Sequence, residues 1–197
     1  IRYAGISPEI GLSETQQTLV LNGLRGQVML QVDGQLKTGR DIVLMAMLGA
    51  EEYGFATAAL IVLGCVMMRK CNQNTCPVGV ATQNPELRKR FLGRSEYLVN
   101  YFTFLAQEVR EYLAEIGAKS MDEIIGRTDL IVRKADDGVK KHELINFSRL
   151  LTRINSDAGI HHVIDEQHGI ETGKDVEILR AAAETLENQR EMSLEYT

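Results

Sequence analysis

Three cysteines are the residues of this chain whose type and spacing point most directly to chemistry. Cys65, Cys71 and Cys76 fall within twelve residues, and the chain has no other cysteine. An odd number in one window does not build a disulfide framework, and clustered thiols in a reducing compartment more often bind metal or do redox work. The spacing also lacks the Cys-x-x-Cys pairs of structural zinc sites.

Three thiolates on one loop suit a cluster with three protein-bound irons, the [3Fe–4S] type. Pro77 directly follows the last cysteine, and a Cys-Pro ending is typical of ferredoxin cluster loops. The alternative interpretation is three buried thiols without a ligand, because free cysteine is among the most buried residue types.

A second group of residues is arranged to bind phosphate. Residues 27–32 alternate in character and predict a short strand that ends in a turn at Gly34. An apolar helix with Thr38 as its N-cap follows. Residues 51–57 then predict a second strand, with a second glycine turn at Gly54.

In a parallel strand–helix–strand unit both turns lie at the same end of the sheet. Converging backbone N–H groups and helix N-termini there form a cradle for phosphate, and in a (β/α)8 barrel such a cradle follows strands 7 and 8. Lys37 and Arg40 add positive charge beside it. The alternative is two ordinary surface turns.

The remaining predicted elements are mostly helices. Residues 1–12 are expected to form a loop, and capping boxes at Ser13 and Ser120 predict helices, the first over 14–24 and the second ended by Gly126. The other expected helices are a buried one over 58–68 that delivers Cys65, a short one from Asn84-Pro85 to Phe91, an amphipathic one capped by Ser95 and ended by Gly117, and a charged one over 176–192.

The C-terminal part differs in character. Residues 135–142 are charged and read as a linker, and His161, His162 and His168 lie in a polar segment with acidic residues. We interpret these as surface histidines, with a metal site as the less favoured alternative, because their spacing matches no known ligand pattern.

Composition limits the function classes. The 197 residues are 44% hydrophobic and 25% charged, with a net charge of −5, which indicates a globular protein without a basic field for nucleic acid. The longest apolar run, 56–64, is too short to cross a membrane. The length permits one domain, but neither end resembles a natural terminus.

Several contiguous stretches resemble the large subunit of the glutamate synthase family. They are Asp-Gly-Gln-Leu-Lys-Thr-Gly-Arg-Asp at 33–41, Leu-Gly-Ala-Glu-Glu-Tyr-Gly-Phe-Ala-Thr at 48–57, and the cysteine loop from Gly64 through Asn-Thr-Cys-Pro-Val-Gly-Val-Ala-Thr-Gln, which ends at Gln83. The similarity continues through 85–91 and, more loosely, to about Leu130.

This resemblance implies an α/β fold, the last two βα units of a (β/α)8 TIM barrel, with an iron–sulfur loop and a helical extension. Residues 1–83 would hold the barrel part, 84–134 the helical extension, and 135–197 a linker and helix toward a further domain. The three cysteines would ligate a [3Fe–4S] cluster. The implied FMN-binding residues are Asp33, Gly34, Gln35, Lys37, Gly39, Arg40, Gly54, Phe55, Ala56 and Thr57.

The implied reaction is reductive transfer of the glutamine amide nitrogen to 2-oxoglutarate, giving two glutamates. The remainder of the large subunit and an electron donor, an NADPH-oxidising small subunit or ferredoxin, would be partners, without nucleic acid or membrane. The location would be cytoplasmic, or plastid in a photosynthetic eukaryote. The alternatives are a related flavin and iron–sulfur barrel with another amino-group substrate, or a non-catalytic metal-binding subunit of a split enzyme.

Two departures from the family pattern are visible. Many FMN barrels have a second glycine where this chain has Gln35, and a side chain there limits close approach of the backbone. The family's cysteine nucleophile, its barrel strands 1 to 6 and its substrate-binding residues are outside this sequence, so no catalytic residue is assigned.

Overall fold

The structure is a computed structural model that describes residues 5–133, 144–155, 157, 159–164, 173–188, 191 and 193. The chain divides into two compact units, residues 1–163 and 164–197. The second unit contains helix α7, Lys174–Asn188, close to the predicted 176–192. The predicted linker 135–142 and His168 lie outside the described residues.

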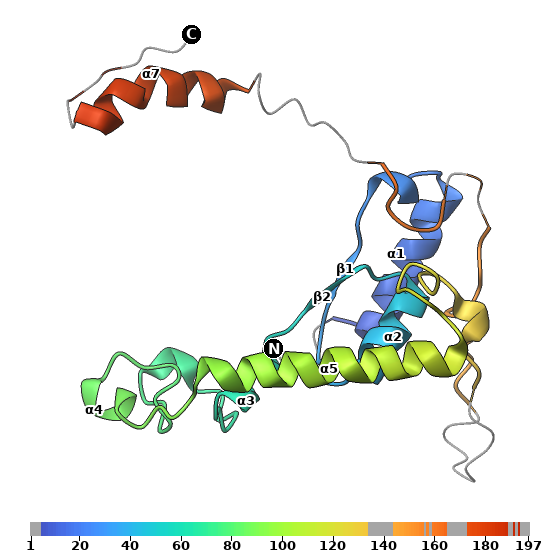
Figure 1. Ribbon diagram of the computed structural model, residues 1–197, viewed down its shortest axis with the longest axis horizontal. Helices are drawn as coiled ribbons and strands as arrows, with labels where there is room; N and C mark the ends of the chain where they lie inside the picture. Colours follow the sequence, from blue (N-terminus) through green and yellow to red (C-terminus); the bar gives the residue numbers. More distant parts are fainter. Residues whose placement is uncertain are drawn as a thin grey trace. The chain divides into compact units, whose positions relative to one another are not determined.

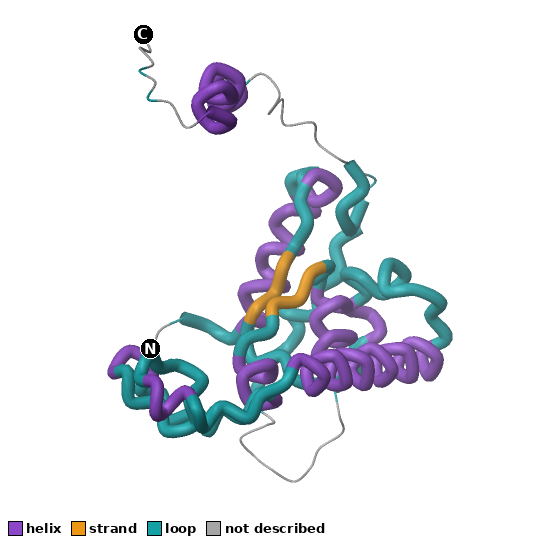
Figure 2. Tube along the Cα trace, turned by 60° about the vertical axis from the view of Figure 1, so that its left-hand side comes forward, coloured by secondary structure: helices purple, strands orange, loops and turns teal. Residues whose placement is uncertain are grey.

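A parallel strand–helix–strand unit forms the centre of the first unit (Figures 1 and 2). Strand β1, Gln31–Asp33, pairs in parallel with β2, Glu52–Gly54, and helix α2, Gly39–Leu48, connects them. In the register, Asp33 lies opposite Gly54. The predicted order is confirmed, but both strands are shorter than predicted. The first begins only at Gln31, after the 3-10 turn η1, Arg25–Gln27, and three residues without regular structure.

Helix α2 forms the core of this unit. It packs between α1, Pro8–Leu21, and α5, Ser95–Ile116. Its predicted ends are confirmed: Thr38 Oγ1 accepts from the Asp41 N–H within a capping box, and Gly49 ends the helix. Burial of each large aliphatic side chain stabilises the fold by roughly 1.5–3 kcal/mol. The buried α2 side chains are Ile42, Val43, Met45, Ala46, Met47 and Leu48.

Helix α1 begins earlier than predicted. Pro8 is its first residue and Ser7 its N-cap, so residues 8–12 are helical rather than a loop. The predicted capping box at Ser13 is wrong, because Ser13 lies buried inside the helix and its hydroxyl donates to the Leu150 carbonyl at 2.6 Å. Proline at the first helical position was the correct start signal, since its missing N–H needs no partner there.

The predicted buried helix over 58–68 is also wrong in length and in burial. Helix α3 covers Thr57–Val62 only. Gly64, with φ +94°, turns the chain, and the Cys65 N–H donates to the Leu60 carbonyl at 2.9 Å. Leu60 and Ile61 are exposed, since only one face of this short helix packs on the described part of the chain.

The elements after the cysteine loop follow the predicted order with changed ends. Asn84 caps α4, Pro85–Arg88, because its side-chain oxygen accepts from the N–H groups of Glu86 and Leu87, but the helix ends before Phe91. Ser95 is the first residue of α5 rather than its cap, and Gly117 ends that helix as predicted.

Residues 120–126 form turns instead of the predicted short helix. The Gly126 N–H donates to the Ala46 carbonyl at the end of α2, at 2.9 Å. Nucleation of a helix is costly, and a segment this short forms too few helical hydrogen bonds to offset that cost. The tertiary hydrogen bond to Ala46 holds it as a turn instead. Within the described ranges, no helix combines the length and the apolar character needed to cross a membrane.

Candidate functional site

All three cysteines line one cavity of about 300 Å³. Cys65 lies three residues after the end of α3. Cys71 is the first residue of the 3-10 turn η2, Cys71–Gln73. Cys76 lies two residues after Asn74, the left-handed residue that ends this turn. All three thiols are free, with Cys71 exposed and the other two half-buried. The predicted clustering in space is therefore present, on a loop that changes direction sharply between each pair of cysteines.

Left-handed backbone at non-glycine residues gives this loop its shape. Met67, Arg69 and Asn74 have φ between +56° and +58°. Asn74 is a residue type that adopts this conformation readily, and its side-chain oxygen accepts from the Gln83 N–H at 2.7 Å and from the Thr82 hydroxyl at 2.9 Å. Asn74 thereby fastens the middle of the loop to its end.

The backbone that follows Cys76 changes the acidity of its thiol. Hydrogen bonds from Ala81 above all, and then from Val78, Val80 and Gly79, lower the pKa of the Cys76 thiol. Gly79 is required for this path, since its φ is +77° and a Cβ there would lie 2.5 Å from the Leu87 carbonyl oxygen. The site therefore favours thiolate, the form that ligates metal.

The other sulfurs have fewer protein partners. The Met67 N–H donates to Cys65 Sγ at 3.4 Å, and the Met67 thioether lies 3.7 Å from the same atom. Among the described residues, no three His, Cys, Asp or Glu side chains converge so as to hold a single metal ion.

The two glycine turns adjoin at the C-terminal end of the sheet. Gly54 lies opposite Asp33, and a Cβ on Gly54 would approach the Asp33 Cβ to 2.9 Å. Gln35 has φ +61°, the left-handed conformation that glycine adopts most easily. The Gln35 side chain itself is exposed.

Helix α3 connects these turns to the cysteines. Phe55 and Ala56 lead into it, and its first residue, Thr57, lines the cysteine cavity. Six residues of α-helix extend about 9 Å, so the two candidate sites are neighbours. Phe55 packs edge-on against Phe102 of α5, with ring centroids 5.2 Å apart, which fixes the turn against the helical layer.

The predicted residues at the start of α2 are arranged differently. The backbone N–H of buried Gly39 donates to Glu108 Oε2 of α5 at 2.6 Å, so a protein carboxylate already takes one of the first amides of this helix. A Cβ on Gly39 would lie 2.7 Å from the Val109 nitrogen. Gly39 is therefore a close-packing position, whereas Lys37 and Arg40 are exposed beside it.

His161 and His162 line a separate cavity of about 350 Å³ with the acidic residues Glu51 and Asp122. The Nδ1 atom of His161 is buried and has no hydrogen-bond partner in the described part of the chain. This cavity shares no lining residue with the cysteine cavity.

Sequence reasoning missed several residues of the cysteine site. It gave no role to the backbone of 78–81, whose hydrogen bonds lower the pKa of Cys76. It also gave Glu108 no role. The Gly79 glycine and the Asn74 asparagine were the available signals, because both residue types mark left-handed backbone.

Comparison with known proteins agrees with the sequence resemblance. Residues 1–119 match the family model described as a conserved region in glutamate synthase. The chain is 50% identical, over 98% of its length, to the glutamate synthase (NADPH) large chain of Bacillus subtilis, and 47% identical over 95% to the glutamate synthase (NADH) of Schizosaccharomyces pombe. It is 51% identical, over 79% of its length, to the ferredoxin-dependent glutamate synthase of Antithamnion.

The chain spans only 13%, 9% and 10% of the lengths of these three relatives. It corresponds to one segment of much longer proteins. The chain belongs to the glutamate synthase family, as a segment of its large chain.

Proposed function

We propose that this chain supplies the FMN phosphate site and the [3Fe–4S] site of a glutamate synthase. The observation that carries the proposal is that Cys65, Cys71 and Cys76 line one cavity, together with Thr57 from the predicted phosphate turn. A [3Fe–4S] cluster takes one thiolate at each of three irons, so it needs the three thiols that this cavity offers. The lowered pKa of Cys76 supports the same use.

The cluster would supply one-electron transfer and FMN would supply hydride transfer to the substrate. The protein residues position these groups. Asp33, Gly34, Gln35 and 54–57 would present backbone N–H groups to the phosphate at the strand ends, and Lys37 and Arg40 would add positive charge. The amides around Cys76 would stabilise negative charge on sulfur, which sets the potential of a bound cluster.

In this proposal the two βα units are the last part of a (β/α)8 barrel that the rest of the protein completes. Residues 1–83 belong to the barrel, 84–134 to its helical extension and 135–197 to the connection beyond. The whole protein would transfer the glutamine amide nitrogen to 2-oxoglutarate. The segment is 47–51% identical to glutamate synthases named for NADPH, NADH and ferredoxin. We therefore infer that the cluster site in this segment is the same whichever of these donors supplies the electrons.

The test is Cys71→Ala in the full-length protein, with Asn72→Ala as the matched control on the same exposed turn. We expect Cys71→Ala to abolish the [3Fe–4S] signal in electron paramagnetic resonance, because one iron loses its protein ligand. Asn72→Ala should retain the signal. A signal of full strength in Cys71→Ala would refute the ligand assignment.

A further inference from the structure

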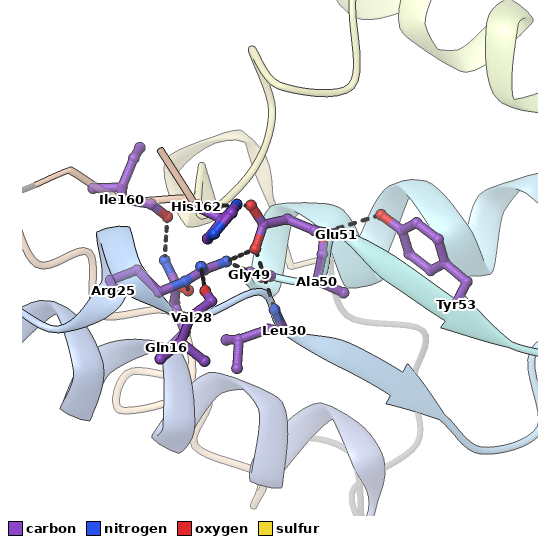
Figure 3. A network of polar contacts seen from close by, with 10 residues as sticks. All are labelled: Gln16, Arg25, Val28, Leu30, Gly49, Ala50, Glu51, Tyr53, Ile160 and His162. Atoms are coloured by element: carbon purple, nitrogen blue, oxygen red, sulfur yellow. Dashed lines mark hydrogen bonds and ion pairs between the residues drawn. The ribbon is translucent and has the colours of Figure 1, made fainter. Parts of the chain in front are cut away.

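A buried polar network lies at the end of the sheet opposite to the glycine turns (Figure 3). Arg25 is fully buried and forms an ion pair with Glu51, whose side chain is 11% exposed. Glu51 directly precedes β2, and its Oε2 also accepts from the N–H of Leu30, the residue before β1, at 3.2 Å. The network therefore lies where both parallel strands begin.

The guanidinium of Arg25 forms four hydrogen bonds within the protein. Its Nε donates to Gln16 Oε1 at 2.5 Å, its Nη2 donates to the Gly49 carbonyl at 3.0 Å as well as to Glu51, and its Nη1 donates to the Val28 carbonyl. This arrangement offsets the large penalty for burying a charge. It also neutralises Glu51 and orients the Gln16 amide.

The atoms of Gln16 and Glu51 that do not bind Arg25 form hydrogen bonds to one segment, residues 160–163, which we call the strap. Gln16 Nε2 donates to the Ile160 carbonyl at 2.8 Å, and Glu51 Oε1 accepts from the His162 N–H at 2.7 Å. A third bond joins the Val163 N–H to the Gly26 carbonyl at 2.9 Å. All three bonds use main-chain groups of the strap.

We propose that Gln16, Arg25 and Glu51 form a binding site for an extended polypeptide segment, which the strap occupies. Recognition by main-chain hydrogen bonds is typical of sites that bind extended peptides and that tolerate varied side chains. Val163 is 58% exposed and is the last residue of the first unit. The site thereby anchors the chain where it leaves this unit, at the N-terminal end of β1 and β2.

At His162 the proposal predicts that loss of the main-chain N–H releases the strap, whereas loss of the side chain does not. His162→Pro removes the N–H that Glu51 binds, whereas His162→Ala removes only the side chain. In the full-length protein we expect hydrogen exchange of the Val163 amide to be faster by about tenfold to a hundredfold in His162→Pro, the effect of one lost bond to a charged group. In His162→Ala it should remain as slow as in the unchanged protein.

The buried amides of α2 serve as an internal reference, since exchange there reports unfolding of the core. They should remain strongly protected in both variants, which separates release of the strap from loss of the fold. Equal acceleration in His162→Ala and His162→Pro would overturn recognition by the main chain. Unchanged Val163 exchange in His162→Pro would overturn the binding site itself.

A second variant tests the site from the other side. Glu51→Gln keeps the shape of the side chain but removes the charge and one acceptor oxygen, so it should also accelerate Val163 exchange. Tyr53→Phe is the matched control, because the Tyr53 hydroxyl bonds to the Ala50 carbonyl and not to the strap. If Tyr53→Phe released the strap as much as Glu51→Gln, the assignment to Glu51 would be wrong.

Discussion

At the scale of single residues, the cysteine site depends on backbone conformation as much as on thiols. Backbone hydrogen bonds from residues 78–81, Ala81 above all, lower the pKa of the Cys76 thiol, although desolvation opposes this shift. They can do so because Gly79 adopts a left-handed conformation against the Leu87 and Phe91 backbone.

Gly79→Ala is predicted to damage this arrangement, with Gly64→Ala as its control. Both glycines have positive φ, but a Cβ on Gly64 would meet no atom within 4 Å, whereas one on Gly79 would meet backbone at 2.5 Å. Gly64→Ala should lower the free energy of unfolding by only the conformational strain, about 1–2 kcal/mol. Gly79→Ala should lower it by more.

The same pair of variants changes the chemistry of Cys76 differently. The amide hydrogen bonds lower the pKa of this thiol, so in cluster-free protein its alkylation should begin at a lower pH than that of an ordinary cysteine. Displacing the amides in Gly79→Ala should move the alkylation profile of Cys76 to higher pH. The profile in Gly64→Ala should stay in place, and an equal shift in both would contradict the role of the amides.

The sequence predicts residues at this scale when their chemistry is carried by side chains. Cys65, Cys71 and Cys76 were identified by type and spacing, and the cavity confirms that they lie together. The amides of 78–81 could not be predicted, because every residue has an N–H and only the tertiary path of the loop directs four of them to one atom. Asn74 could have been recognised from its preference for left-handed backbone.

At the scale of elements, the strand–helix–strand unit depends on close contact between α2 and α5. Glu108 of α5 accepts the Gly39 N–H, and the missing Cβ of Gly39 lets the α5 backbone approach. Local signals predicted α2 well, since its cap, its apolar run and its terminal glycine all agree. They failed for α1 and α3, whose boundaries depend on Pro8 and on the turn at Gly64.

Gly39→Ala and Gly11→Ala should change stability in opposite directions. A Cβ on Gly39 would lie 2.7 Å from the Val109 nitrogen, so the substitution should separate α2 from α5 and lower the melting temperature of the full-length protein. Gly11 lies inside α1, and a Cβ there would meet only the end of the Ile6 side chain, at 3.7 Å. Gly11→Ala should stabilise by about 0.5–1 kcal/mol through helix propensity.

Calorimetric melting of both variants checks this prediction. Because Gly39 packs against α5, Gly39→Ala should lower the free energy of unfolding by more than it lowers the free energy of flavin binding to the folded protein. A stable Gly39→Ala protein with selectively weakened flavin binding would instead favour direct contact between Gly39 and the cofactor.

At the scale of the whole molecule, the described sheet has too few strands to enclose a flavin at the proposed phosphate site. It has two parallel strands with three residue pairs, whereas parallel sheets occur almost only with several strands and with both faces covered. The α3 side chains Leu60 and Ile61 are also exposed, so this helix lacks a packing partner on one face within the described residues. The chain also spans only about a tenth of its relatives' length.

The 197-residue chain expressed alone is therefore predicted not to hold FMN tightly. It contributes two strand-end turns of the proposed phosphate cradle, and the walls that enclose the rest of the flavin would come from the other strands of the proposed barrel. Titration of the isolated chain with FMN should show no stoichiometric quenching of flavin fluorescence, whereas the full-length protein should purify with bound flavin. Stoichiometric yellow protein from the isolated chain would show that the two turns are sufficient, and the barrel would then be unnecessary for binding.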